Sequence, residues 1–160
     1  MYSFRNDYSE GAHPKVLQAL ADTNLRQTVG YGMDPCCQAA ADTIRRLCAA
    51  PDAAVHFLVG GTQVNLVTID AFLQSYEAVV AAQTGHVSTH ETGAIEATGH
   101  KVCTVESPDG KLTPALVESV LAGHNGTEHM VLPRMVYISD TTEIGTVYTR
   151  AELAALRQCC

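Results

Sequence analysis

The chain has 160 residues, of which 46% are hydrophobic and 17% charged, and its formal net charge is −7. This composition is typical of a globular domain, and the acidic balance argues against a nucleic-acid partner, because binding to a phosphate backbone needs clustered Lys and Arg. No apolar run reaches the roughly 18 to 20 residues of a membrane span, and the first residues lack the apolar stretch of a signal peptide. We therefore expect a cytoplasmic protein with no membrane association.

The first part of the chain predicts two helices. Pro14 suits the first position of a short helix, because it has no amide hydrogen to lose there. Asp34 followed by Pro35 is an N-cap and first-turn signal for a second helix, which we expect to end near Leu47. We expect residues 1–50 to form an N-terminal arm with these helices.

From residue 51 onward, short apolar runs alternate with helical stretches. The runs predict strands over residues 55–59, 77–81, 101–105 and 135–138. Helices are expected over residues 62–73, from Pro114, and after Thr149, where Thr149 and Glu152 form a capping box. Strands separated by such helices are typical of βαβ units, so the expected fold class is α/β, with a partial, mostly parallel sheet flanked by helices. The last helix reaches the final residues without a stop signal, so we expect residues 51–160 to be an incomplete cofactor-binding domain.

Cysteine spacing argues against a metal site. The six cysteines are two vicinal pairs and two single residues: Cys36-Cys37, Cys159-Cys160, Cys48 and Cys103. Neither a CxxC motif nor a Cys/His spacing typical of zinc is present. We expect reduced cysteines in or near the core, because buried Cys behaves as a small hydrophobic residue.

A glycine-rich turn is the strongest local signal of a ligand site. Gly60, Gly61, Thr62 and Gln63 follow an apolar run and open a predicted helix. Two glycines allow close approach of the backbone, and the free amides of a helix start attract a phosphate, to which the Thr hydroxyl adds a donor. The alternative is a plain tight turn in which Thr62 caps the helix. The turn matches neither a Walker loop nor a GxGxxG fingerprint.

Two further polar segments follow predicted strands. In an open α/β sheet, ligands bind at the carboxyl ends of the strands, so these segments should face the same crevice as the glycine turn. In the first segment, His86 could stack on a flat cofactor, while His90 and Glu91 could act on a substrate or position groups that do. The second segment spans residues 139–148. The alternatives are a solvated histidine and a simple polar connection.

Together these segments resemble the threonine aldolase and β-eliminating lyase family of fold-type-I pyridoxal phosphate enzymes. The resemblance runs nearly end to end, and the motifs that carry it are Arg5-Asn6-Asp7, Ala12-His13-Pro14, Tyr31-Gly32-Met33-Asp34, Gly61-Thr62-Gln63-Val64-Asn65 and the run from Thr142 to Tyr148. It implies that the chain is the first part of the large domain of such an enzyme. The implied cofactor is pyridoxal 5'-phosphate.

The resemblance also implies roles for the site residues. Gly60, Gly61 and Thr62, helped by Gln63, would hold the cofactor phosphate, and His86 would stack on the pyridine ring. The implied reaction cleaves a β-hydroxy-α-amino acid such as threonine into glycine and an aldehyde. Another amino-acid β-eliminating lyase, a different phosphate-ligand enzyme and a non-catalytic module that associates through exposed apolar faces remain alternatives.

The resemblance also implies contacts between subunits, and the sequence departs from the family pattern at three positions. Members assemble as dimers or tetramers with shared active sites, which would place Asn6 and Tyr31 at the substrate or at a neighbouring subunit's site. Asn6 stands where many members have Ser, His90 where many have Tyr, and Thr142 where several have His. Substrate identity is therefore less constrained than cofactor identity.

The resemblance places two catalytic groups, an Asp for the pyridine nitrogen and a Lys for covalent attachment of the cofactor, beyond residue 160. The lysines of this chain are Lys15, Lys101 and Lys111, which we interpret as surface charges. The isolated chain is therefore expected to be inactive.

Overall fold

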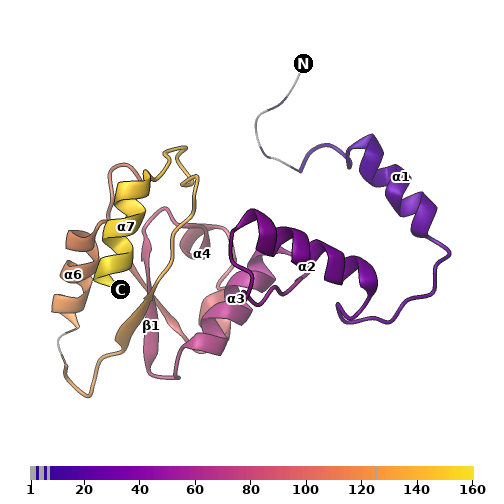
Figure 1. The fold of residues 1–160 in the computed structure, drawn as a ribbon. Coiled ribbons are helices and arrows are strands. Elements are labelled where there is room, and N and C mark those ends of the chain that lie inside the picture. The colour runs from indigo at the N-terminus through magenta and orange to yellow at the C-terminus, as the bar shows by residue number, and fades with distance from the viewer. Residues whose placement is uncertain (1–2, 4–5, 7, 125) are drawn as a thin grey trace. The chain divides into compact units, whose positions relative to one another are not determined.

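The computed structural model describes residues 3, 6, 8–124 and 126–160, so Arg5 and Asp7 of the first motif lie outside the described residues (Figure 1). The chain divides into two units, Met1–Phe57 and Leu58–Cys160. None of the helices formed by the described residues is long and apolar enough to cross a membrane.

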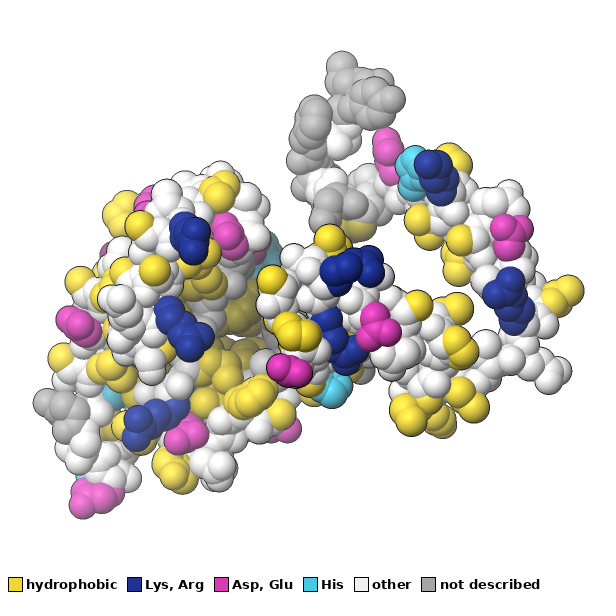
Figure 2. Space-filling model, in the orientation of Figure 1, with side chains coloured by type: hydrophobic (Ala, Val, Ile, Leu, Met, Phe, Trp, Pro, Cys, Tyr) yellow, Lys and Arg dark blue, Asp and Glu magenta, His cyan; other side chains and the backbone are white. Residues whose placement is uncertain are grey.

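Unit Met1–Phe57 contains the two helices predicted from their first residues. Helix α1 spans Pro14–Thr23, and α2 spans Pro35–Leu47. The side chain of Asp34 caps α2 by accepting hydrogen bonds from the amides of Cys36 and Cys37, at 2.8 and 3.0 Å. None of the residues of α1 is buried, and its apolar side chains contribute to the hydrophobic surface visible in Figure 2.

Unit Leu58–Cys160 is an α/β arrangement around a three-stranded parallel sheet. Its elements in chain order are α3 (Gly61–Phe72), β1 (Glu77–Ala82), α4 (His86–Thr89), α5 (Ala94–Ala97), β2 (Lys101–Val105), α6 (Pro114–Gly123), β3 (Leu132–Val136) and α7 (Arg150–Cys159). The strand order is β2-β1-β3, with β1 in the middle and both pairings parallel. The predicted fold class is confirmed.

Strand β1 explains how this sheet is covered. From Ala78 to Ala82 every residue is buried, as expected for a parallel strand with helices on both faces. Helices α3, α4 and α5 cover one face, where Val79 and Ala81 pack, and α6 and α7 cover the other, where Val80 packs (Figure 1). Burying each valine side chain contributes roughly 1.5–3 kcal/mol of stability.

The two core clusters tie the helices to the sheet. The cluster on the α3 side consists of Ile69, Leu73, Val79, Ala81, Val87 and Ile95. The cluster on the α6 side consists of Val80, Ala82, Leu112, Val117, Tyr148 and Leu156. Because successive residues of a strand point to opposite faces, the alternation along β1 sends its side chains to the two clusters in turn.

The predicted strand over residues 55–59 was wrong. These residues are irregular, because a strand exists only through pairing, and none of the described residues pairs with this run. The last strand also begins earlier than predicted, at Leu132, and includes Pro133. The register shifts where Pro133 pairs with Ala78, and proline is tolerated at such irregularities because it cannot donate to the ladder.

The cysteines are only partly as expected. All six are free, as predicted, but Cys103 alone is buried, while Cys36, Cys48 and Cys160 are exposed. The expectation of core or near-core positions was therefore wrong for these three. Cys36 lies in the first turn of α2, and Cys48 and Cys160 are the C-cap residues of α2 and α7, so all three stand at helix ends, whereas Cys103 lies within β2 and is buried there.

Candidate functional site

Helix α3 begins with unused hydrogen-bond donors. Gly60 is its N-cap in an extended conformation, and no side chain caps this helix. Among the described residues, no group accepts a hydrogen bond from the amides of Gly61, Thr62 and Gln63. A Cβ atom added at Gly60 or Gly61 would meet nothing within 4 Å, so the space beside the turn is open. Open space and three free amides at a helix start suit an anion.

The side chain of Gln63 folds back onto the backbone that precedes α3. Its Oε1 accepts a hydrogen bond from the amide of Val59 at 2.9 Å. This contact leaves the amide nitrogen of the Gln63 side chain, together with its backbone amide, as possible donors to a ligand. Gln63 therefore also stabilises the turn that it belongs to.

The histidine segment follows the carboxyl end of β1. His86 is the first residue of α4, and Gly85 is its N-cap. A Cβ atom at Gly85 would lie 3.0 Å from the carbonyl oxygen of Ala82, closer than most Cβ atoms approach a neighbouring atom. Glycine therefore allows the chain to turn directly out of β1 and into the segment that carries His86.

Asn65, Glu91 and His86 form a connected polar group. Nδ2 of Asn65 donates to Oε1 of Glu91 at 2.5 Å, and Nδ1 of His86 lies 2.7 Å from the same oxygen. The side chain of Glu91 is fully buried, while that of His86 is 38% exposed. Because Asn65 lies one helical turn after Gly61, this network brings the glycine turn and the histidine segment together.

The network extends to the end of β3. Nδ2 of Asn65 lies 3.4 Å from the hydroxyl of Tyr137, which in turn accepts from Oγ of Ser139 at 3.5 Å. Groups from α3, from the segment after β1 and from the segment after β3 thus meet at the carboxyl ends of two neighbouring parallel strands. This is the position where open α/β sheets bind ligands.

His90 lies beside His86, at the C-cap of α4. The two ring centroids are 5.5 Å apart, and the ring planes are tilted by 59°. His90 is exposed, whereas Glu91 next to it is buried. Of the two residues, only His90 can therefore contact a ligand at the surface of the site.

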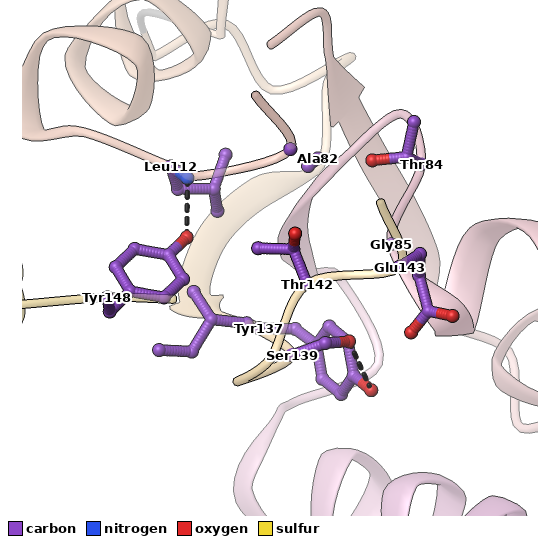
Figure 3. A pocket seen from close by; sticks show the side chains of 11 residues that line it. Ala82, Thr84, Gly85, Leu112, Tyr137, Ser139, Thr142, Glu143 and Tyr148 are labelled. Carbon is purple, nitrogen blue, oxygen red and sulfur yellow. Dashed lines mark hydrogen bonds between the residues drawn. The ribbon is translucent and has the colours of Figure 1, made fainter. Parts of the chain in front are cut away.

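The polar segment of residues 139–148 lines a small cavity beside this network (Figure 3). Its volume is about 10 Å³, close to the minimum for one water molecule, so it cannot hold a cofactor. Figure 3 shows Thr142 between the side chains of Tyr148 and Glu143, and the hydroxyl of Tyr148 directed at the backbone of Leu112. Thr142 is buried and its hydroxyl bonds to that of Thr146 at 2.7 Å. This segment is more than a polar connection, because it packs into the core through Tyr148.

Lys111 differs from the expected surface charge. Its side chain is only 15% exposed, its Nζ lies 2.9 Å from Oε1 of Glu152, and the ammonium group lies 5.8 Å from the centroid of the Tyr148 ring. The hydrogen bond to Glu152 raises the pKa of Lys111. Lys15 and Lys101 are exposed, as predicted.

Asn6 and Tyr31 belong to the other unit. Oδ1 of Asn6 accepts hydrogen bonds from the amide of Tyr8 at 3.1 Å and from Oγ of Ser9 at 2.7 Å. Tyr31 is fully exposed and has a φ angle of 63°, in the left-handed region that few residues other than glycine adopt. Its ring is therefore accessible to another surface.

Asn65 and Tyr137 were not among the predicted site residues. A signal existed for Asn65, since its place four residues after Gly61 puts it one turn further along the same helix. For Tyr137 the signal was its place at the end of an apolar run, where polar groups point into a crevice. No local pattern paired either residue with Glu91.

Comparison with known proteins identifies the family to which this sequence belongs. The family model described as "Beta-eliminating lyase" matches residues 4–160. The chain belongs to the beta-eliminating lyase family. The match includes the glycine turn, the histidine segment and the segment after β3, which are the parts of this lyase-family chain that converge at the sheet edge.

Individual relatives of this lyase-family chain are threonine aldolases. The low specificity L-threonine aldolases of Pseudomonas sp. (strain NCIMB 10558) and Pseudomonas aeruginosa are 36% and 35% identical over 159 residues. A solved structure of Leishmania major threonine aldolase is 56% identical and superposes over the whole chain with a TM-score of 0.96. The chain spans 45% of the length of each Pseudomonas protein and 46% of the Leishmania chain.

Proposed function

We propose that this chain supplies the phosphate and ring contacts of a pyridoxal 5'-phosphate-dependent aldehyde-lyase of the threonine aldolase type. Such an enzyme cleaves a β-hydroxy-α-amino acid, with threonine as the reference substrate, into glycine and an aldehyde. The observation that carries the proposal is the Asn65–Glu91–His86 network, which links a partly exposed imidazole to α3, the helix that begins with the free amides. Similarity to threonine aldolases along the whole chain supports it.

The glycine turn fits the phosphate of this cofactor. Gly61, Thr62 and Gln63 offer three backbone amides without an intramolecular acceptor, and the open space beside Gly60 lets an anion approach them. Thr62 is exposed, and its hydroxyl would add a fourth donor. Hydrogen bonds from these groups to a charged phosphate are each worth about 1.5–3 kcal/mol.

The histidine segment fits the ring of the cofactor and the substrate beside it. The planar ring of His86 is partly exposed, and its Nδ1 is fixed by the hydrogen bond with Glu91. This arrangement suits stacking on a flat heterocycle. His90 is exposed next to it and is positioned to contact the substrate side chain. When bound, pyridoxal phosphate supplies an electron sink for the electron pair left by breaking of the Cα–Cβ bond.

Assembly is part of the proposal. The exposed ring of Tyr31 and the turn that contains Asn6 would complete the substrate site of a neighbouring subunit in a homo-oligomer. We place this oligomer in the cytoplasm. Its substrate would be a small amino acid. Cross-linking of a protein with cysteine introduced at Tyr31 would identify the surface that this position contacts.

Binding of pyridoxine 5'-phosphate tests the proposal. This probe carries an alcohol in place of the aldehyde, so surface lysines cannot react with it. We expect saturable binding that needs the phosphate, with unphosphorylated pyridoxine and adenine nucleotides competing poorly. Thr62→Ala should weaken binding about tenfold, which corresponds to loss of one charge-assisted hydrogen bond. Thr68→Ala, at an exposed threonine six residues further along α3, is the matched control.

A second pair of variants tests the ring contact. His86→Ala should weaken binding of pyridoxine 5'-phosphate but not of inorganic phosphate, because it removes only the stacking surface. His129→Ala, at an exposed histidine, should change neither. Equal competition by nucleotides, or equal effects of the His86 and His129 variants, would refute the proposed cofactor site.

A further inference from the structure

We propose that Glu91 is a positioning residue, which acts with Asn65 to hold the ring of His86 in the tautomer that carries its hydrogen on Nδ1. Nε2 of His86 then faces the site as a proton acceptor. Its use in catalysis rests on the proposed function, whereas the tautomer is a property of the unliganded chain.

Burial excludes direct contact between Glu91 and a substrate. The side chain of Glu91 has no exposed surface, while the ring of His86 is 38% exposed. Oε1 of Glu91 lies 2.7 Å from Nδ1 of His86, a distance typical of a strong, charge-assisted hydrogen bond. Any effect of the carboxylate on a ligand therefore passes through the two groups bonded to it, His86 and Asn65.

The hydrogen-bond pattern selects the tautomer. An ionised carboxylate only accepts hydrogen bonds, so the hydrogen between Glu91 and His86 belongs to Nδ1. In neutral imidazole the other nitrogen then carries a lone pair. When Nε2 takes up a proton, the positive ring remains bonded to a buried negative group, which compensates the new charge.

Asn65 fixes the carboxylate itself. Its Nδ2 donates to the same Oε1 at 2.5 Å, and the amide lies 3.4 Å from the hydroxyl of Tyr137. Both donors to Glu91 therefore converge on one oxygen. Because Asn65 is part of α3, the helix that presents the phosphate donors also sets the orientation of the His86 ring.

The second oxygen of Glu91 makes a sharp test possible. Among the described residues, no group donates to Oε2, although it is buried. A glutamine at this position can keep its carbonyl oxygen in place of Oε1 and put its NH₂ group where Oε2 was. Glu91→Gln thus preserves the acceptor for His86 and removes the charge, whereas Glu91→Leu removes both.

Nuclear magnetic resonance of the unliganded chain with ¹⁵N-labelled histidine measures the tautomer directly. Long-range ¹H–¹⁵N correlations in mildly alkaline buffer, assigned through His86→Gln, should show His86 with hydrogen on Nδ1. The Glu91→Gln variant should keep this pattern, while Glu91→Leu and Asn65→Ala should lose it and populate the Nε2-protonated form. Glu96→Leu, at an exposed glutamate of α5, should leave the pattern unchanged.

Two results would overturn the inference: hydrogen on Nε2 of His86 in the parent chain, or the same tautomer in the Gln and Leu variants of Glu91. The parent spectrum decides the first point even if Glu91→Leu fails to fold, and Asn65→Ala replaces that variant for the second. Because these spectra need no ligand, failure of pyridoxine 5'-phosphate to bind would count against the proposed function alone.

Discussion

The hydroxyl of Tyr148 accepts a hydrogen bond from the backbone amide of Leu112, at 2.6 Å, and both residues are buried. Tyr148 lies at the end of the segment after β3, and Leu112 precedes α6, so this bond joins two connections that are 36 residues apart. Burial raises the pKa of Tyr148, which keeps the phenol neutral over a wide pH range.

Removing that hydroxyl should destabilise the fold. In Tyr148→Phe the amide of Leu112 stays buried without an acceptor, which costs about 1–3 kcal/mol of unfolding free energy. Urea denaturation followed by circular dichroism measures this loss. Tyr76→Phe is the control, because Tyr76 is 60% exposed and no described residue hydrogen-bonds its hydroxyl. Equal stability of the two variants would show that the Leu112 amide finds another partner.

Gly110 should tolerate a side chain poorly. Its φ angle is +72°, and an added Cβ atom would lie 3.2 Å from Cγ1 of Ile144 and 3.3 Å from Cβ of Thr142. Gly99 has a φ angle of +93° but open space around its Cα, so Gly99→Ala measures backbone strain alone. We expect Gly110→Ala to lose about 1–3 kcal/mol more than Gly99→Ala in chemical denaturation. A smaller loss in Gly110→Ala would mean that the loop moves to accommodate the methyl group.

Acid should remove a contribution of Glu152 to stability. The amide of Thr149 donates to its Oε2 at 2.6 Å and Lys111 to its Oε1 at 2.9 Å, and these bonds lower its pKa from 4.5 to about 2. A carboxyl group with a lowered pKa stabilises the fold fully above its unfolded value, here 4.5, and this contribution is lost as the pH falls toward about 2.

Thermal melting from neutral pH into this acidic range tests the assignment. The Glu152→Gln variant should start with a lower melting temperature at neutral pH and lose less on acidification than the parent chain. Glu118→Gln, at an exposed position on α6, should follow the parent curve. Parallel curves for the parent and Glu152→Gln would contradict the prediction.

The cysteines should react in order of their exposure. Cys36, Cys48 and Cys160 are exposed and should be alkylated first by iodoacetamide. Cys103 should react last, because it is buried, its Sγ lies 3.6 Å from Nε2 of His124, and burial raises its pKa and so lowers its thiolate fraction. Mass spectrometry of timed digests gives the order, and addition of urea should abolish the difference. Early labelling of Cys103 would indicate that β2 opens locally.

Local signals in the sequence predicted most of the helices and strands. Asp34 and Thr149 cap α2 and α7 as expected, because a cap depends on the few residues that follow it. The strand over 101–105 was predicted with its observed bounds. Residues 55–59 have the same apolar texture but form no strand, because pairing depends on a neighbour that local sequence does not reveal.

The site was predictable in its parts but not in its connections. His86 and Thr62 were singled out as candidates because each stands next to a turn that suits a ligand. The hydrogen bond between Asn65 and Glu91 spans 26 residues and arises only when α3 packs on the segment after β1. The ion pair between Lys111 and Glu152 spans 41 residues, and for the same reason Lys111 was misinterpreted as a surface charge.

The central place of β1 has a consequence for how the sheet opens. Its residues from Ala78 to Ala82 are buried and have parallel partners in β2, and Ala78 to Val80 also face β3. Most of its amides can therefore reach water only when one of the neighbouring strands detaches or the whole unit unfolds. In a deuterium-exchange experiment, the amides of β1 should be the last of the three strands to take up label, and their rate would report the global stability of unit Leu58–Cys160.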